Sequence, residues 1–202
     1  MDKNCRNCRK FGAKLFLKGD RCISAKCAFT RRTNPPGTVP LKKQNIRRIK
    51  KSEYGIQLQE KQKAKSEYGI RETQFKNIFK KSARSKGATG ETLLQMLELR
   101  LDNVIYRLGW SSSRKQARQL VGHRHIKING KIVSIPSLLV KTKDVIEPVK
   151  INVIKDNIKE KVSLPKWIKS NKNMQAEILS KPSREEIDTP IDEQLIVEYY
   201  SR

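Results

Sequence analysis

The chain has 202 residues, and its 45 lysine and arginine side chains outnumber its 20 aspartate and glutamate side chains, which gives a net charge of +25. This length is enough for one or two domains with hydrophobic cores. No apolar run approaches the roughly 20 residues of a membrane-spanning helix, and the basic N-terminal half lacks the amphipathic helix of a membrane-surface binder. We therefore expect a nucleic acid to neutralise this charge.

All four cysteines fall within the first 27 residues, as Cys5-x2-Cys8 and Cys22-x4-Cys27. Two close pairs separated by a loop have the spacing of a tetrahedral four-thiolate metal site. Sulfur ligands select zinc or an iron–sulfur cluster over magnesium or calcium; we favour one zinc ion and keep the cluster as the alternative. The charged, cysteine-bearing N-terminus does not resemble a signal peptide, so we expect reduced thiols in an intracellular compartment. Five nearby cations are expected to lower the thiol pKa values: Arg6, Arg9, Lys10, Arg21 and Lys26.

A basic arm and three helices are predicted next. Residues 31–51 contain no acid, and Pro35-Pro36-Gly37 excludes a helix there, so we expect the arm to become ordered only on its partner. Ser52 and Glu53 begin the first helix, which ends near 68–69. The second helix spans 71–86. Thr89 opens the third, whose continuous apolar stripe predicts one helix as far as Leu108.

Residues 113–133 combine a short basic helix with a β-hairpin. Ser113 is a predicted N-cap, Gly122 is the predicted stop signal, and Asn129-Gly130 favours a tight turn between two strands. Arg114, Lys115, Arg118 and Gln119 share the outward side of this helix. A charged helix face alone fits simple solvent exposure equally well, and it is the charge of the whole chain that favours nucleic acid. The stretch contains no acid–base pair or nucleophile, so we predict no enzymatic activity.

The remainder of the chain predicts further short elements. Residues 135–146 are predicted to form two strands around a turn, and 182–186 a capped helical turn, while 192–202 fits a helix or a strand equally well. Helices followed by several strands indicate a small α+β domain.

Motifs spread over almost the whole chain point to a known family. They include Cys-x2-Cys at 5–8, Lys-Leu-Phe-Leu-Lys-Gly at 14–19, Cys-x4-Cys at 22–27, Arg-Leu-Asp-Asn-Val at 100–104, Tyr-Arg-Leu-Gly at 106–109, Ser-Arg-Lys-Gln-Ala-Arg-Gln-Leu-Val at 113–121 and the closing Glu-Gln-Leu-Ile-Val-Glu-Tyr-Tyr-Ser-Arg. In this combination the chain resembles the bacterial-type small-subunit ribosomal protein S-four family.

The resemblance implies an α+β fold with four segments. A metal-binding N-terminal extension and basic arm would occupy 1–45, a mainly helical domain would be split between 46–98 and 163–202, and an RNA-binding module with helices packed on a short-stranded antiparallel sheet would be inserted at 99–162. It further implies a structural constituent of the small ribosomal subunit, in a bacterial cytoplasm or an organelle. Such a protein would bind the ribosomal RNA at a multi-helix junction of the 5′ domain and nucleate assembly of the subunit body. It would also influence translational accuracy with ribosomal proteins S-five and S-twelve, and line the messenger RNA entry path.

We predict RNA contacts from two sets of side chains, in which arginine matters more than lysine wherever a phosphate is bound through two hydrogen bonds. The RNA-binding module supplies Arg114, Lys115, Arg118, Gln119, Arg124, Lys127 and Lys131. The rest of the chain supplies Arg6, Lys18, Arg31, Arg32, Arg47, Arg48, Lys61 and Lys63. The metal ligands would be Cys5, Cys8, Cys22 and Cys27.

The chain departs from the family pattern at two glycines. Arg124 takes the place of the glycine in the family's usual His-Gly-His-Ile motif, and Lys143 replaces the turn glycine before Asp144. If these positions require a positive φ, the side chains there are strained. His123 and His125 would stack on a base, bond a phosphate or stabilise the turn. The alternatives to a ribosomal protein are a free RNA-binding regulator, an accessory of an RNA-modifying enzyme that carries the same module, and a zinc-dependent DNA regulator.

Overall fold

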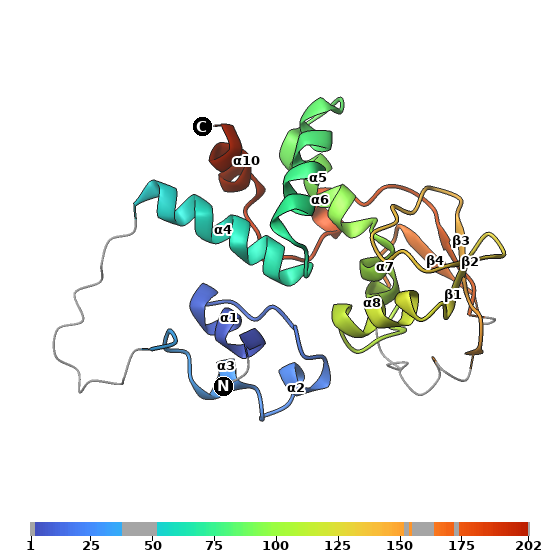
Figure 1. Cartoon of the computed structure of the whole chain (residues 1–202), viewed down its shortest axis with the longest axis horizontal. Helices are drawn as coiled ribbons and strands as arrows, with labels where there is room; N and C mark the ends of the chain where they lie inside the picture. The colour runs from blue at the N-terminus through green and yellow to red at the C-terminus, as the bar shows by residue number, and fades with distance from the viewer. Residues whose placement is uncertain (1–2, 38–51, 152–153, 155–163, 172–173, 202) are drawn as a thin grey trace. The chain divides into compact units, whose positions relative to one another are not determined.

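The computed structural model describes residues 3–37, 52–151, 154, 164–171 and 174–201, and Figure 1 shows their helices and strands. The chain divides into two compact units: residues 1–72 with 190–202 form unit 1, and residues 73–189 form unit 2. Within these described ranges, no helix has the length and apolar character needed to cross a bilayer.

Unit 1 contains a small N-terminal head and two longer helices. The head comprises α1 (Lys3–Phe11), α2 (Asp20–Ile23) and α3 (Ala28–Arg31), with Cys8, Phe11 and Leu15 at its core. Helix α4 (Glu53–Glu67) begins as predicted, because the Ser52 hydroxyl accepts a hydrogen bond from the Gly55 N–H at 3.2 Å.

The C-terminal segment is the helix α10 (Glu193–Ser201), which packs along α4 (Figure 1). Gln57 of α4 donates a hydrogen bond to Glu198 of α10 at 3.0 Å, and Tyr200 donates to Glu72 at 3.1 Å. These tertiary contacts select helix over strand for a segment whose sequence pattern fits both.

Unit 2 begins with four helices: α5 (Glu72–Arg84), α6 (Thr89–Glu98), α7 (Leu101–Arg107) and α8 (Arg114–Gly122). We predicted a single helix from Thr89 to Leu108. This prediction is wrong, because the helix is interrupted at Leu99 and Arg100. Arg100 is extended, with φ −68° and ψ 136°, and forms an isolated bridge with Leu139. Both α6 and α7 bury their leucines in unit 2, so the apolar pattern in the sequence continues through the break.

A five-stranded antiparallel sheet, with the order β2-β1-β3-β5-β4, completes unit 2. Its strands are β1 (Ile126–Ile128), β2 (Lys131–Val133), β3 (Val145–Pro148), β4 (Ile168–Ser170) and β5 (Ala176–Ile178). The predicted hairpin is confirmed, with φ of 50° at Asn129 and 77° at Gly130.

Two further expectations about this region need correction. Of the two strands predicted in residues 135–146, one is formed as β3, and the other is reduced to the bridge at Leu139. Strands β4 and β5 lie in the range that we assigned to the helical domain, yet they pair into this sheet. The short 3-10 helix η1 (Arg184–Glu186) is the predicted capped turn, with a capping box between Ser183 and Glu186.

The core of unit 2 joins the helices to the sheet. Leu101, Ile105 and Trp110 from the α7 region meet Val121 of α8 in one buried cluster. The same cluster includes Ile126, Ile146, Trp167, Ala176 and Ile178 from the strands and their flanks. Helix α8 is therefore fixed on its apolar side, which leaves its polar side for contact with a partner.

Candidate nucleic-acid interface

Helix α8 presents the predicted polar side chains along one side. Ser113 caps the helix by accepting a hydrogen bond from the Gln116 N–H at 3.3 Å, and Ala117, Leu120 and Val121 are buried. Lys115, Arg118 and Gln119 are exposed, and Arg114 is half-buried. The structure therefore brings the four α8 residues of the prediction together on one surface.

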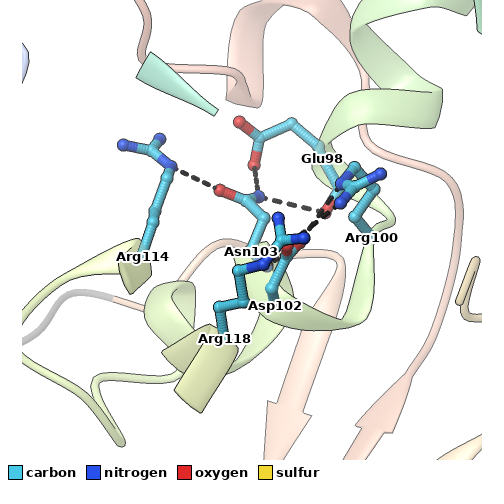
Figure 2. A network of polar contacts seen from close by, with 6 residues as sticks. All are labelled: Glu98, Arg100, Asp102, Asn103, Arg114 and Arg118. Atoms are coloured by element: carbon cyan, nitrogen blue, oxygen red, sulfur yellow. Dashed lines mark hydrogen bonds and ion pairs between the residues drawn. The ribbon is translucent and has the colours of Figure 1, made fainter. Parts of the chain in front are cut away.

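A buried polar network fixes the guanidinium of Arg114 (Figure 2). Arg114 Nε donates to Asn103 Oδ1 at 2.8 Å, and the guanidinium lies 4.6 Å from the centre of the Tyr106 ring. Asn103 in turn donates from Nδ2 to the Glu98 carboxylate at 2.7 Å and to the Glu98 backbone carbonyl at 3.0 Å. Glu98 also receives two hydrogen bonds from Arg107, at 2.8 and 2.9 Å. Asn103 and Glu98 are each only 1% exposed, so this chain of contacts is shielded from water.

A second branch of the network approaches Arg118 from Asp102 (Figure 2). Arg100 donates two hydrogen bonds to the Asp102 carboxylate, at 3.0 and 3.2 Å, and both side chains are buried. Arg118 Nη1 lies 4.0 Å from Asp102 Oδ2, while the Arg118 side chain remains 46% exposed. Asp102 thus attracts one side of Arg118 and leaves much of its guanidinium accessible to an anion.

Helix α8 ends in a tight turn that contains Arg124. The Arg124 N–H donates to Val121 O at 2.9 Å and the His125 N–H donates to Leu120 O at 3.1 Å, which is the hydrogen-bond pattern of a Schellman motif. In that motif the residue corresponding to Arg124 is left-handed and is usually glycine; here it is an exposed arginine with φ 63°. The helix therefore ends at Gly122 as predicted, but the left-handed residue that ends it is Arg124.

The two predicted cations of the hairpin lie on opposite faces of the sheet. Side chains alternate along a strand, so Lys127 lies on the face opposite to Ile126 and Ile128, which join the core cluster shared with α8. Lys131 is the direct partner of Ile128 and shares its face, where it is exposed on the edge strand. The structure thus places Lys131, but not Lys127, on the side of the sheet that carries α8.

The head carries its own group of cations. Arg6, Arg31 and Arg32 are exposed, and Lys18 is half-buried. A hollow of about 190 Å³ is lined by Arg21, Lys26, Ala28, Arg31 and Arg32. Arg21 and Lys26 were not among the predicted contacts, although their positions beside Cys22 and Cys27 were the signal that could have identified them.

The four cysteines surround one small hollow in the head, together with Lys14, Leu17 and Lys18. Cys8, Cys22 and Cys27 are buried, and the Lys18 N–H donates to Cys22 Sγ at 3.3 Å. All four thiols are free, and among the described residues no three His, Cys, Asp or Glu side chains stand together at metal-binding positions. The donors therefore face a common space without the close grouping of a formed metal centre.

Burial sets the thiol pKa values more strongly than the surrounding cations do. Burial raises the pKa of the Cys8 and Cys22 thiols, contrary to the lowering that we expected from neighbouring basic residues. At Cys27 burial acts in the same direction, but hydrogen bonds from the backbone N–H groups of Thr30 and Phe29 and from the Thr30 hydroxyl, together with the charge of Lys14, outweigh it and lower the pKa.

Lys61 and Lys63, which we predicted to contact RNA, are buried in α4. Lys61 donates to Glu72 at 2.7 Å and lies 4.4 Å from the centre of the Tyr199 ring. Lys63 pairs with Glu60 at 3.1 Å. These two lysines therefore serve contacts within unit 1. Arg47 and Arg48 lie outside the described residues.

Comparison with known proteins identifies the family to which this chain belongs. Residues 1–98 match the family model of the ribosomal protein S4/S9 N-terminal domain, and residues 99–146 match the S4 domain. The chain is 51% identical to small ribosomal subunit protein uS4 of Caldicellulosiruptor bescii, over 98% of this chain and 97% of that protein. The chain belongs to the uS4 family. Protein uS4 of Syntrophomonas wolfei is also 51% identical, over 100% of this chain and 98% of that protein. Protein uS4A of Clostridium acetobutylicum is 51% identical, over 98% of this chain and 96% of that protein.

The match to the S4 domain includes Arg114 and Arg118 of α8. The residues that position Arg114, namely Glu98, Asn103 and Tyr106, were missed as functional residues by the sequence prediction. The available signal was their location inside the motifs Arg-Leu-Asp-Asn-Val and Tyr-Arg-Leu-Gly.

Proposed function

We propose that this chain is a non-catalytic structural protein of the small ribosomal subunit, and that it grips folded ribosomal RNA through the polar side of α8. The observation that carries this proposal is the buried network that fixes Arg114 inside a matched S4 domain. A guanidinium held in place in advance loses less side-chain entropy when it binds a phosphate. Lys115, Arg118, Gln119, Arg124 and Lys131 would extend this surface, and Arg6, Lys18, Arg31 and Arg32 would form a second contact from the head.

The family resemblance supports a more specific role. We propose binding at a multi-helix junction in the 5′ domain of the small-subunit RNA, where the chain would nucleate assembly of the subunit body. Ribosomal proteins S-five and S-twelve would be its neighbours in controlling accuracy, and the messenger RNA entry path would run beside it. Lys127, on the far face of the sheet, and Arg47 and Arg48, in the basic arm, are proposed as secondary RNA contacts.

Binding to a small-subunit RNA transcript tests the main proposal. The double variant Arg114→Gln and Arg118→Gln should bind the transcript at least tenfold more weakly and enter reconstituted subunits poorly. Arg84→Gln is the matched control, because it removes one exposed arginine at the end of α5, away from α8. Binding by the double variant that equals the wild type, with circular dichroism showing both to be folded, would overturn the proposal.

We also propose that Cys5, Cys8, Cys22 and Cys27 bind one zinc ion. The donor set fits, because four thiols face one hollow and backbone N–H groups already donate to the sulfurs of Cys22 and Cys27. Zinc would replace the thiol protons, cross-link the head and supply folding free energy that so small a core lacks.

Metal analysis of the purified full-length chain, with its visible spectrum, tests the zinc proposal. One zinc per chain in a colourless sample is expected, and Cys22→Ser should lower the metal content. Visible absorbance with bound iron would assign a cluster instead, and a folded wild-type chain without either metal would contradict the proposed site.

A further inference from the structure

A further hollow lies along the C-terminal half of α8, beside the stripe that carries Arg114 and Arg118. Its volume is about 200 Å³, and Gln116, Gln119, Leu120, His123 and His125 line it. This volume is below the roughly 300–1,000 Å³ of pockets that take drug-sized ligands, and it suits a single small planar group. The hollow belongs entirely to unit 2.

Four of the five lining residues are glutamines or histidines and the fifth is Leu120, so no lysine, arginine or carboxylate is among them. Gln116, Gln119, Leu120 and His123 recur at helical spacing, so they form one stripe of α8. The arginines at 114 and 118 form the neighbouring stripe. An arginine stripe binds phosphates irrespective of sequence, whereas amides and imidazoles provide the hydrogen bonds and flat surfaces that recognise bases.

The turn that ends α8 fixes the backbone at the two histidines. The His123 N–H donates to Gln119 O at 2.9 Å, and the His125 N–H donates to Leu120 O at 3.1 Å. The imidazole rings lie 6.2 Å apart, with 25° between their planes. Two nearly parallel rings at one end of a hollow provide a preformed stacking surface for another aromatic ring.

The neighbouring glutamine is also fixed in advance. Gln116 Oε1 accepts hydrogen bonds from the Ser112 N–H at 2.8 Å and from the Ser112 hydroxyl at 2.7 Å. Gln119, one turn further along, is exposed at the rim of the hollow. Its amide has both a donor and an acceptor, which matches the edge of any nucleobase.

We infer that this hollow binds one unpaired nucleobase of the ribosomal RNA, stacked on His123 or His125 and hydrogen-bonded by Gln119. The inference rests on the proposed RNA-binding function and assigns to the same surface a subsite that recognises a base rather than a phosphate. It gives α8 two tasks, because the arginine stripe holds the backbone while the neutral stripe selects an extruded base. Unpaired bases stacked on aromatic side chains are the usual means of sequence-specific RNA recognition.

Full-length variants bound to a small-subunit 5′-domain transcript, measured at several salt concentrations, test the inference. His123→Ala and Gln119→Ala should each weaken binding about five- to thirtyfold. The slope of log affinity against log salt should stay unchanged, because no phosphate contact is lost. His123→Phe should restore most of the affinity lost in His123→Ala, because phenylalanine keeps the stacking surface. Ultraviolet crosslinking of the wild-type complex should join the peptide containing His123 and His125 to a single nucleotide.

Arg118→Gln serves as the comparison, since it should reduce that slope by about 0.7–0.9. If Arg118→Gln weakens binding while His123→Ala and Gln119→Ala bind normally, the base subsite is wrong and the RNA-binding function stands. If His123→Ala reduces the slope as Arg118→Gln does, the histidine contacts phosphate and the inference is overturned. If none of these variants changes binding, the proposed function itself fails.

Discussion

Arg124 occupies a backbone conformation that suits glycine. Its φ of 63° lies in the left-handed region, where a side chain costs about 1–2 kcal/mol. A cation at a helix C-terminus recovers only about 0.3–1 kcal/mol of this cost through the helix dipole. We therefore expect Arg124→Gly to raise the free energy of unfolding by about 0.5–1 kcal/mol, measured by urea denaturation, while RNA affinity falls through the loss of one cation.

Two glycine substitutions provide the comparison for Arg124→Gly. Lys143 also has a positive φ, of 71°, so Lys143→Gly should stabilise the chain similarly. Lys115 lies in the regular helix α8, where glycine should destabilise by about 1 kcal/mol. Destabilisation by all three substitutions would show that the left-handed conformation carries no strain.

Sequence alone identified these strained positions but not the fate of buried lysines. Arg124 and Lys143 were singled out because they replace glycines, and their positive φ values agree. Lys61, in contrast, has the sequence surroundings of an exposed basic residue, and its partners Glu72 and Tyr199 are brought to it only by folding. A side chain's burial depends on such distant partners, which local sequence does not reveal.

At the scale of elements, the break between α6 and α7 is the feature that sequence missed. The break falls at Leu99 and Arg100, and neither residue is a glycine or proline that would signal the end of a helix. At the break, backbone groups form hydrogen bonds with a distant segment. The Leu101 N–H donates to Leu138 O at 2.8 Å, and the Val140 N–H donates to Leu99 O at 2.9 Å. The break brings the backbone of Glu98 and the amide of Asn103 together, and so creates the network that anchors Arg114.

Asn103→Ala tests this network. The substitution removes one hydrogen bond from the buried Glu98 carboxylate, which keeps its two bonds from Arg107, and one from the Glu98 backbone carbonyl. We therefore expect a loss of about 1–3 kcal/mol in the free energy of unfolding. Arg114 would also lose its anchor, so RNA affinity should fall several-fold with little change in the salt slope. Asn77→Ala on the exposed side of α5 is the matched control and should be nearly neutral. Normal RNA binding by a folded Asn103→Ala chain would limit Asn103 to a role in stability.

The contact between α4 and the start of α5 should make stability depend on pH. Burial acts to raise the pKa of Glu72, but hydrogen bonds from Lys61 at 2.7 Å and Lys65 at 2.8 Å outweigh it and lower the pKa to about 2. An unfolded glutamate titrates near about 4.3, so this stabilisation is present above that pH and is lost as the pH falls towards 2.

Glu72→Gln should therefore lower the stability at pH 7, and the difference from the wild type should shrink between about pH 4.5 and 2. Because the Glu72 side chain is 43% exposed, solvent screening keeps the effect modest. Urea denaturation across this pH range measures it, with Glu185→Gln in η1 as the control for an exposed carboxylate. A difference that stays constant with pH would exclude the ion pairs as its cause.

For the whole molecule, composition predicted the kind of partner better than it predicted the architecture. The excess charge and the motifs of residues 113–121 indicated an RNA-binding surface, and the structure places those residues together on α8. The place of strands β4 and β5 in the sheet was not foreseen, because both are too short to carry a clear alternation. Strand β5 gains its hydrogen bonds from β3, and β4 gains its hydrogen bonds from β5. Likewise, the spacing of the cysteines predicted a common site but not their protonation, which depends on burial.

The net charge of +25 leads to a prediction for the intact chain. If about ten phosphates are neutralised on binding, log affinity for the small-subunit transcript should fall with log salt with a slope of about −7 to −9.

The cations of the head and of α8 should contribute separately to this slope. Each of two double variants should therefore make the slope shallower by about 1.4–1.8: Arg31→Gln with Arg32→Gln in the head, and Arg114→Gln with Arg118→Gln in α8. Filter binding from low to moderate salt measures the slopes of the wild type and of the two double variants. Arg84→Gln is the control that changes the charge elsewhere. A steep slope that only the α8 pair alters would remove the head from the interface, and a slope near zero would mean that the charge does not serve RNA binding.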